Sequence, residues 1–219
     1  RDGAAFPKDG INDHVVSGAA TVNPAATGTK ASAIYRRDVP AGGEVTITLR
    51  LSTTAAGMGV GADAPTVFAT RIAEADAFYA DRIPATVSPD RRRIARQAHA
   101  GMHWSKQFFH YIVSDWLDGD DVPPPSDRQH GRNKEWRHFY AEDIISMPDT
   151  WEYPWFASWD LCFHTVVLAR TDLAFAKQQV LLLTREWYMR PDGQVPAYEW
   201  AFGDVNPPLQ VWAGLQIAN

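Results

Sequence analysis

The side chains best suited to chemistry in this chain gather in the stretch WEYPWFASWDLCFH, from Trp151 to His164. It carries four aromatic residues at positions 151, 153, 155 and 156, followed by Trp159 and Asp160 where a helix is predicted to begin. Aromatic rings stack on the C–H faces of sugars, while sugar hydroxyls require charged or polar partners. The stretch is therefore a candidate sugar-cleaving site around Asp160. The alternative is a tryptophan-rich core segment with a surface acid.

A second group of candidate ligands lies between Asp118 and Thr150, the longest stretch that we predict to be irregular. It contains Arg132, Asn133 and Trp136. Loops longer than about 15 residues in a compact domain are usually functional or disordered, and the aromatic content argues against disorder. These side chains either contact a hydroxyl-rich ligand or stabilise the loop itself, and the sequence leaves both interpretations open.

A third candidate is Glu199, which stands between Tyr198 and Trp200 in the segment QVPAYEWAFGDVNPP. We interpret it as a ligand for a sugar hydroxyl or as part of the site's scaffold, in preference to a catalytic base. Carboxylates in such loops commonly cap helices or tie the loop together, and Asp204 has the position of a cap for the next helix.

The remaining reactive side chains favour structural roles. Cys162 is the only cysteine, so no disulfide forms within the chain, and a buried thiol is favoured over a nucleophile. His103, Lys106 and His110 are predicted to share one side of a helix, but a lysine among them and the absence of nearby acids make a poor metal site. We predict neither a metal nor a cofactor.

Composition limits the classes of partner. The 219 residues are 45% hydrophobic and 21% charged, which is typical of a soluble globular protein, and no apolar run approaches the roughly 18 residues of a membrane span. The net charge of −5 and the lack of a basic run exclude nucleic acid and membrane as expected partners. Nine Trp and ten Phe favour aromatic-lined clefts or large helix interfaces. The oligomeric state stays open.

The N-terminal part of the chain has the pattern of β structure. From Glu44 to Leu51 apolar and polar residues alternate, which predicts a strand with one buried face, and residues 32–38 are its expected antiparallel partner. A shorter strand is predicted for residues 14–17. Because two or three strands need a covering partner, we interpret residues 1–55 as the end of a β-sandwich, followed by a linker and connecting helix over residues 56–87.

Helical patterns dominate the rest, residues 88–219. Ser88, Pro89 and Asp90 form a helix start, and an apolar stripe predicts one long helix from there to near Gly119. Further helices are predicted over residues 158–168, 172–189 and from about 208. This alternation of helices and aromatic loops is typical of a toroid of paired helices, in which the loops at one end build a site.

Four long segments in this order resemble glycoside hydrolase family 63 and its bacterial relatives, the mannosylglycerate-hydrolase-like and processing α-glucosidase-like enzymes: WSKQFFHYIVSDWL, HGRNKEWRHFY, ISMPDTWEYPWFASWDLCFH and LLTREWYMRPDGQVPAYEWAFGDVNPP. The resemblance implies a mainly α fold with an N-terminal β segment, in which the last strands of a β-sandwich precede a partial (α/α)6 toroid. It also implies hydrolysis of α-glucosidic bonds with inversion at the anomeric carbon.

Inverting hydrolysis needs two carboxyl groups about 6.5–9.5 Å apart, one to protonate the leaving oxygen and one to activate water. The resemblance makes Asp160, in the family's Trp-Asp motif, the general acid. It places the general-base glutamate beyond Asn219, so we expect this chain alone to be inactive. The expected carbohydrate-binding residues are Trp151, Tyr153, Trp155, Trp159, Arg132, Asn133, Trp136, Glu199 and Trp200.

The sequence leaves two other functions open. The same fold would suit a trehalase-like or mannosylglycerate-type hydrolase, and a non-catalytic carbohydrate-binding relative would keep the aromatic residues. The chain begins with Arg1 and stops at Asn219 inside a predicted helix, so we expect it to be a fragment. We assign it to the cytoplasm.

Overall fold

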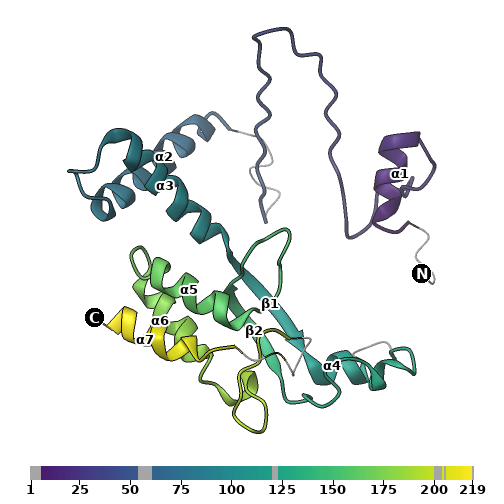
Figure 1. Cartoon of the computed structure of the whole chain (residues 1–219). Helices are drawn as coiled ribbons and strands as arrows, with labels where there is room; N and C mark the ends of the chain where they lie inside the picture. The colour runs from purple at the N-terminus through teal and green to yellow at the C-terminus, as the bar shows by residue number, and fades with distance from the viewer. Residues whose placement is uncertain (1–5, 54–60, 120–122, 200–203, 205, 219) are drawn as a thin grey trace. The chain divides into compact units, whose positions relative to one another are not determined.

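The computed structural model describes residues 6–53, 61–119, 123–199, 204 and 206–218. Within these residues the chain is mainly helical, with a single pair of strands. In chain order the elements are α1 (Asp9–Ser17), α2 (Ala64–Arg82), α3 (Pro89–Trp104), β1 (Lys106–Ile112), α4 (Val113–Asp118), η1 (Arg128–His130), β2 (Tyr140–Ser146), α5 (Ser158–Leu168), α6 (Leu173–Leu182), η2 (Glu186–Tyr188) and α7 (Leu209–Ala218), where η marks a 3₁₀-helix (Figure 1). None of the described helices combines the length and apolarity that a membrane span requires.

Residue contacts divide the chain into two compact units, Arg1–Ala64 and Pro65–Asn219. The first contains α1, so the strand predicted for residues 14–17 is wrong. Asp9 lies in the first turn of α1, and Gly18 ends the helix in the left-handed conformation at φ 72°. An acid at the start and a left-handed glycine after the end are helix signals, and here they outweigh the strand preference of Val15 and Val16.

The two longer strand predictions in the N-terminal unit are also wrong. Residues 32–38 and 44–51 are described, and neither forms a strand. Alternation predicts a strand only when a neighbour supplies the hydrogen bonds and covers the apolar face. The apolar side chains of the expected strand, Val45, Ile47, Leu49 and Leu51, are all exposed. That residues 1–55 belong to a β-sandwich stays a prediction.

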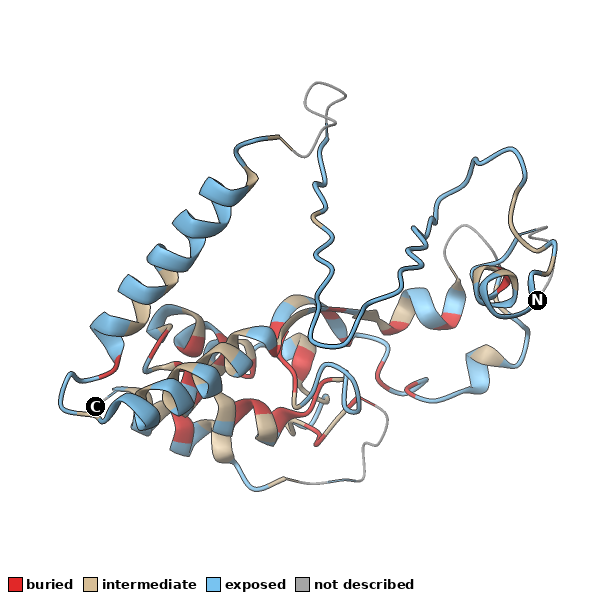
Figure 2. Cartoon of the chain, turned by 90° about the horizontal axis from the view of Figure 1, so that it is seen from above, coloured by how far each residue is buried: buried red, intermediate tan, exposed pale blue. Residues whose placement is uncertain are grey.

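The second unit begins with two helices whose positions the sequence predicts well. The expected connecting helix is α2, and the expected start at Ser88 is confirmed, since Ser88 is the N-cap residue of α3 with Pro89 and Asp90 in the first turn. Neither helix has a buried residue, and α2 is mostly exposed in Figure 2. The apolar stripe of α2 therefore faces outward, with Phe68 and Ile72 both more than half exposed.

The long helix predicted to run to Gly119 is wrong, because α3 ends at Trp104 and the chain continues as β1. β1 pairs in antiparallel register with β2, from Lys106 opposite Ser146 to Ile112 opposite Tyr140. The segment KQFFHYI is rich in aromatic residues, which favour strands when a partner is present. Its partner lies inside the stretch predicted to be irregular. The predicted helical face of His103, Lys106 and His110 is wrong for the same reason.

Helices α5, α6 and α7 pack together beside the sheet (Figure 1). The same unit contains an aromatic core of four fully buried side chains, Trp136, Phe139, Phe156 and Tyr188. The ring centroids of Trp136 and Phe139 are 4.4 Å apart, and those of Phe156 and Tyr188 are 5.2 Å apart. α6 ends at Leu182, earlier than the predicted residue 189, because Tyr188 turns back into this core.

Candidate functional site

Asp160 lies in the first turn of α5, half-buried, beside the exposed Trp159. The start of α5 is held by the segment before Glu199. The backbone N–H of Ser158 donates to the carbonyl of Ala197 at 2.9 Å, and Ala157 pairs with Tyr198 as an isolated antiparallel bridge. The N-terminal end of α5 therefore brings the 157–160 and 197–199 segments together.

The aromatic stretch before α5 divides into surface and core residues. Trp151 and Tyr153 are exposed, and the Tyr153 ring meets the half-buried Trp155 edge-on with centroids 4.8 Å apart. Phe156 is fully buried in the aromatic core. The turn that carries Trp151 is fixed by Asp149, whose carboxylate accepts the backbone N–H of Trp151 at 2.6 Å. These residues therefore present rings to solvent ahead of Asp160.

Glu199 is buried, with 5% of its surface exposed. Burial raises the pKa of its carboxyl group to about 7, against smaller opposing effects from its own N–H, from Arg132 and from the N–H of Phe156. Within the described part of the chain, its Oε2 atom has no hydrogen-bond partner. A buried carboxyl group with a shifted pKa and an unsatisfied oxygen is typical of a functional site.

Because Glu199 gives up hydration on folding, the protein's stability should depend on pH. The carboxyl holds its proton more tightly in the folded state, so its contribution to the free energy of unfolding is intact below about pH 4.5 and falls as the pH rises to about 7. The loss is of order 3 kcal/mol. Urea unfolding from pH 4.5 to 8 should show this slope in the wild type, and Glu199→Gln should remove it. Glu152→Gln, at an exposed carboxyl, is the control that should keep it.

Asn133 connects the polar loop to this carboxyl segment. It is buried and left-handed, at φ 63°, and its amide donates to the Tyr111 hydroxyl at 2.9 Å and to the backbone carbonyl of Glu199. Arg132 lies over the Tyr111 ring at 5.6 Å. Arg132 and Asn133 therefore both contact Tyr111, which the sequence pattern did not indicate, and Asn133 links them to the backbone of Glu199.

Substitutions at Asn133 should separate its two roles. Asn133→Gly keeps the left-handed backbone and removes the side chain with its two hydrogen bonds, for a loss of about 1–3 kcal/mol in the free energy of unfolding. Asn133→Ala adds the strain of a left-handed β-carbon, about 1–2 kcal/mol more. Equilibrium unfolding in urea measures both. Equal stability of the two variants would contradict the role assigned to the left-handed backbone.

The structure does not bring every predicted residue to this site. Trp136 has no exposed surface, and its indole Nε1–H donates to the carbonyl of Met189 at 3.1 Å, so it is a core residue. Trp200 lies outside the described residues. Cys162 is buried, and burial raises the pKa of its thiol to about 12, so the protonated and unreactive form prevails at neutral pH.

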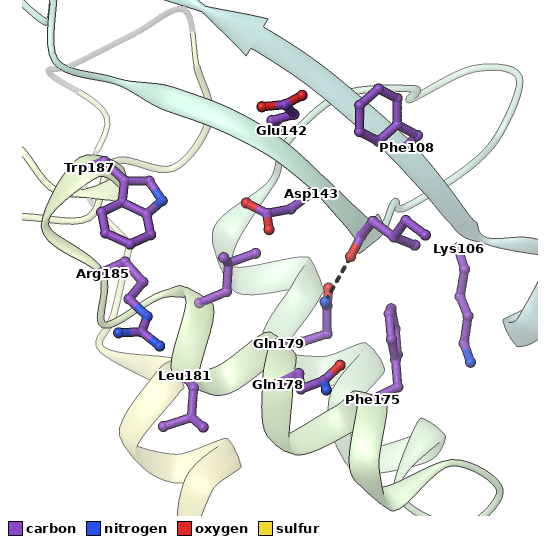
Figure 3. A pocket seen from close by; sticks show the side chains of 12 residues that line it. Lys106, Phe108, Glu142, Asp143, Phe175, Gln178, Gln179, Leu181, Arg185 and Trp187 are labelled. Atoms are coloured by element: carbon purple, nitrogen blue, oxygen red, sulfur yellow. Dashed lines mark hydrogen bonds between the residues drawn. The ribbon is translucent and has the colours of Figure 1, made fainter.

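The second unit has a cavity at the start of α5 and a larger groove beside α6. A cavity of about 220 Å³ opens at the start of α5, where Ser158, Trp159 and Asn206 are among its lining residues. A larger groove of about 820 Å³ lies between the sheet and α6, with Phe108 of β1 and Trp187 of η2 among its walls (Figure 3). Two residues that line this groove are joined by a hydrogen bond: the Gln179 side-chain amide donates to the carbonyl of Ile144 at 2.9 Å. This groove contains none of the predicted site residues.

A hydrogen-bonded group beside Asp160 was missed by the sequence analysis. The hydroxyls of Ser105 and Ser146 lie 2.8 Å apart, and the Ser146 hydroxyl is 2.8 Å from Nδ1 of His164. The position of His164, one helical turn after Asp160, was visible in the sequence. Its link to the two serines depends on the pairing of β1 with β2, which the sequence pattern did not indicate.

Comparison with curated proteins finds a similar yeast protein. The chain is 44% identical over 222 aligned residues to the uncharacterized protein YMR196W of Saccharomyces cerevisiae, a match that covers 95% of this chain and 20% of the yeast protein. The chain thus spans about a fifth of the length of that curated relative. No family model and no solved structure matches the chain.

Proposed function

We propose that this chain is part of an inverting glycoside hydrolase that cleaves α-glucosidic bonds, with Asp160 as the general acid. The observation that carries the proposal is the position of Asp160 in the first turn of α5, beside the exposed Trp159 and at the helix end where the Glu199 segment is anchored. An accessible carboxyl next to an exposed indole suits a sugar whose glycosidic oxygen must be protonated.

The proposed roles follow from burial and charge. Asp160 donates its proton to the departing oxygen, while Trp159, Trp151 and Tyr153 stack against sugar rings. Glu199 and Arg132 bind sugar hydroxyls, because a largely buried carboxyl with an unsatisfied oxygen is a strong partner for an O–H group. The general base is proposed to lie outside this chain.

At the level of the fold, we propose that residues 88–219 form part of an (α/α)6 toroid. The mutual packing of α5, α6 and α7 supports this, because a toroid is built from successive helices in contact. The site then lies at the end where the loops before α5 and α7 meet. The substrate class is an α-linked oligosaccharide or a small α-glucoside.

The test uses the full-length protein that contains this chain. It is incubated with α-linked glucosides, trehalose and mannosylglycerate, and the anomer of the first product is read by ¹H NMR before mutarotation. Release of β-glucose from an α-glucoside is expected. Release of α-glucose would contradict inversion, and turnover confined to trehalose or mannosylglycerate would redirect the substrate assignment. Binding of glucosides without turnover would indicate a non-catalytic carbohydrate-binding protein.

A further inference from the structure

The hydroxyls of Ser105 and Ser146 fix the orientation of the His164 ring. The Ser105 hydroxyl donates to the carbonyl of Met102 at 2.7 Å, and a carbonyl oxygen can only accept. Ser105 must therefore accept from the Ser146 hydroxyl, 2.8 Å away, which uses the single Ser146 proton. Ser146 in turn must accept from Nδ1 of His164, also at 2.8 Å. The chain of bonds thus places a proton on Nδ1 of His164.

Ser105 and Ser146, which anchor this series of hydrogen bonds, carry no charge. Ser105 and Ser146 are both buried, at the point where β1 and β2 begin their pairing, and the backbone N–H of Ser146 donates to the side-chain oxygen of Gln179 at 3.1 Å. The two hydroxyls that lead to the ring are therefore uncharged. Burial lowers the pKa of His164, against a smaller opposing effect of the Asp160 carboxylate, which favours the neutral ring.

A neutral ring with its proton on Nδ1 carries a lone pair on Nε2. Within the described part of the chain, Nε2 makes no hydrogen bond, and Asp160 is the charged group that acts on the ring. The two residues are four apart on α5, a spacing that places side chains next to each other on one face of a helix. A proton acceptor of fixed orientation therefore lies beside the proposed general acid.

We propose that His164 returns the proton to Asp160 after each turnover, an inference that rests on the proposed role of Asp160. In one cycle Asp160 gives a proton to the leaving oxygen, and the attacking water gives one to the base. The base then releases its proton to solvent. His164 takes a proton from solvent on Nε2 and passes it to the Asp160 carboxylate, so both residues regain their starting states and no net proton is consumed. His164 acts through Asp160 and is a positioning residue.

The orientation of the ring is tested without any activity measurement. In protein labelled with ¹⁵N at histidine, the His164 signals are assigned by their loss in His164→Asn. At pH 7.5 the wild type should show a protonated Nδ1 and an unprotonated Nε2, and Ser146→Ala should populate the other tautomer. A wild-type ring protonated on Nε2, or on both nitrogens, would overturn the proposal.

The proton-return role is tested by kinetics on the full-length protein. His164→Asn keeps a donor toward Ser146 but cannot relay a proton, so kcat on an α-glucoside should fall about tenfold or more at pH 8, with a smaller deficit at lower pH where solvent protons are abundant. Added imidazole should restore turnover to His164→Ala. His110→Asn, at an exposed histidine on β1, is the matched control and should leave kcat unchanged.

The outcomes separate the two proposals. Turnover by the wild type with an unchanged pH profile in His164→Asn, or no effect of imidazole on His164→Ala, would overturn the role of His164 and leave Asp160 as the acid. Absence of any glycoside turnover in the wild type would overturn the proposed function, and the role of His164 with it. The NMR result would still report the orientation of the ring.

Discussion

Replacing Asp160 by Asn should lower kcat of the full-length enzyme on α-glucosides by a factor of about 10² to 10⁴, the usual contribution of a general acid. Asn has nearly the same shape as Asp and cannot donate the carboxyl proton. The exposed Trp159 and the Arg132–Glu199 region are left in place, so binding of the substrate should change little. Initial rates and a direct binding measurement such as calorimetry separate the two effects.

Asp90→Asn is a matched control for this experiment. Asp90 also lies in the first turn of a helix, α3, so its replacement removes the same kind of favourable charge from a helix N-terminus. Asp90 is exposed and forms a 2.6 Å ion pair with Arg93, and it is not one of the proposed substrate contacts. We expect normal turnover in this variant. Unchanged turnover in Asp160→Asn itself would rule out Asp160 as the acid.

The second large effect is expected at Trp136. Trp136→Ala should reduce the free energy of unfolding by about 3–5 kcal/mol, because it opens a cavity among Phe139, Phe156 and Tyr188 and leaves the Met189 carbonyl without the indole donor. Urea unfolding followed by far-UV circular dichroism measures this loss.

Trp159→Ala is the companion variant, at an indole that is 42% exposed. It should change the free energy of unfolding by less than about 1 kcal/mol, since no large cavity is formed. In the full-length enzyme it should instead raise KM for α-glucosides, through the loss of a stacking surface. A stability loss at Trp159 as large as that at Trp136 would contradict the assignment of these two indoles to surface and core.

The sequence predicts well those elements whose signals are local. The N-cap at Ser88 and the helices α2, α5 and α7 follow from capping residues and apolar periodicity, and Asp160 is placed correctly in a first helical turn. These features depend on residues close together in the chain, so no knowledge of the partner segments was needed.

The predictions from sequence are wrong or incomplete where the structure of a segment depends on contacts with residues distant in the chain. KQFFHYI continues the apolar stripe of α3, a pattern that predicts helix, but pairing with β2 makes it a strand. Trp136 and the exposed Trp159 have the same side chain and similar polar neighbours in the sequence, so only packing assigns one to the core. The role of Ser146 beside His164 likewise depends on the sheet register.

The left-handed backbone of Asn133 has an evolutionary consequence. Glycine, which relieves the strain at φ 63°, cannot be reached from an asparagine codon by a single base change. The single-base neighbour best suited to the left-handed region is aspartate, whose carboxylate cannot donate to the Glu199 carbonyl and would face its oxygen instead. Aspartate, although a single base change reaches it, therefore does not replace asparagine here without cost. We expect asparagine to persist here among related sequences even where the neighbouring charged residues of the loop have drifted.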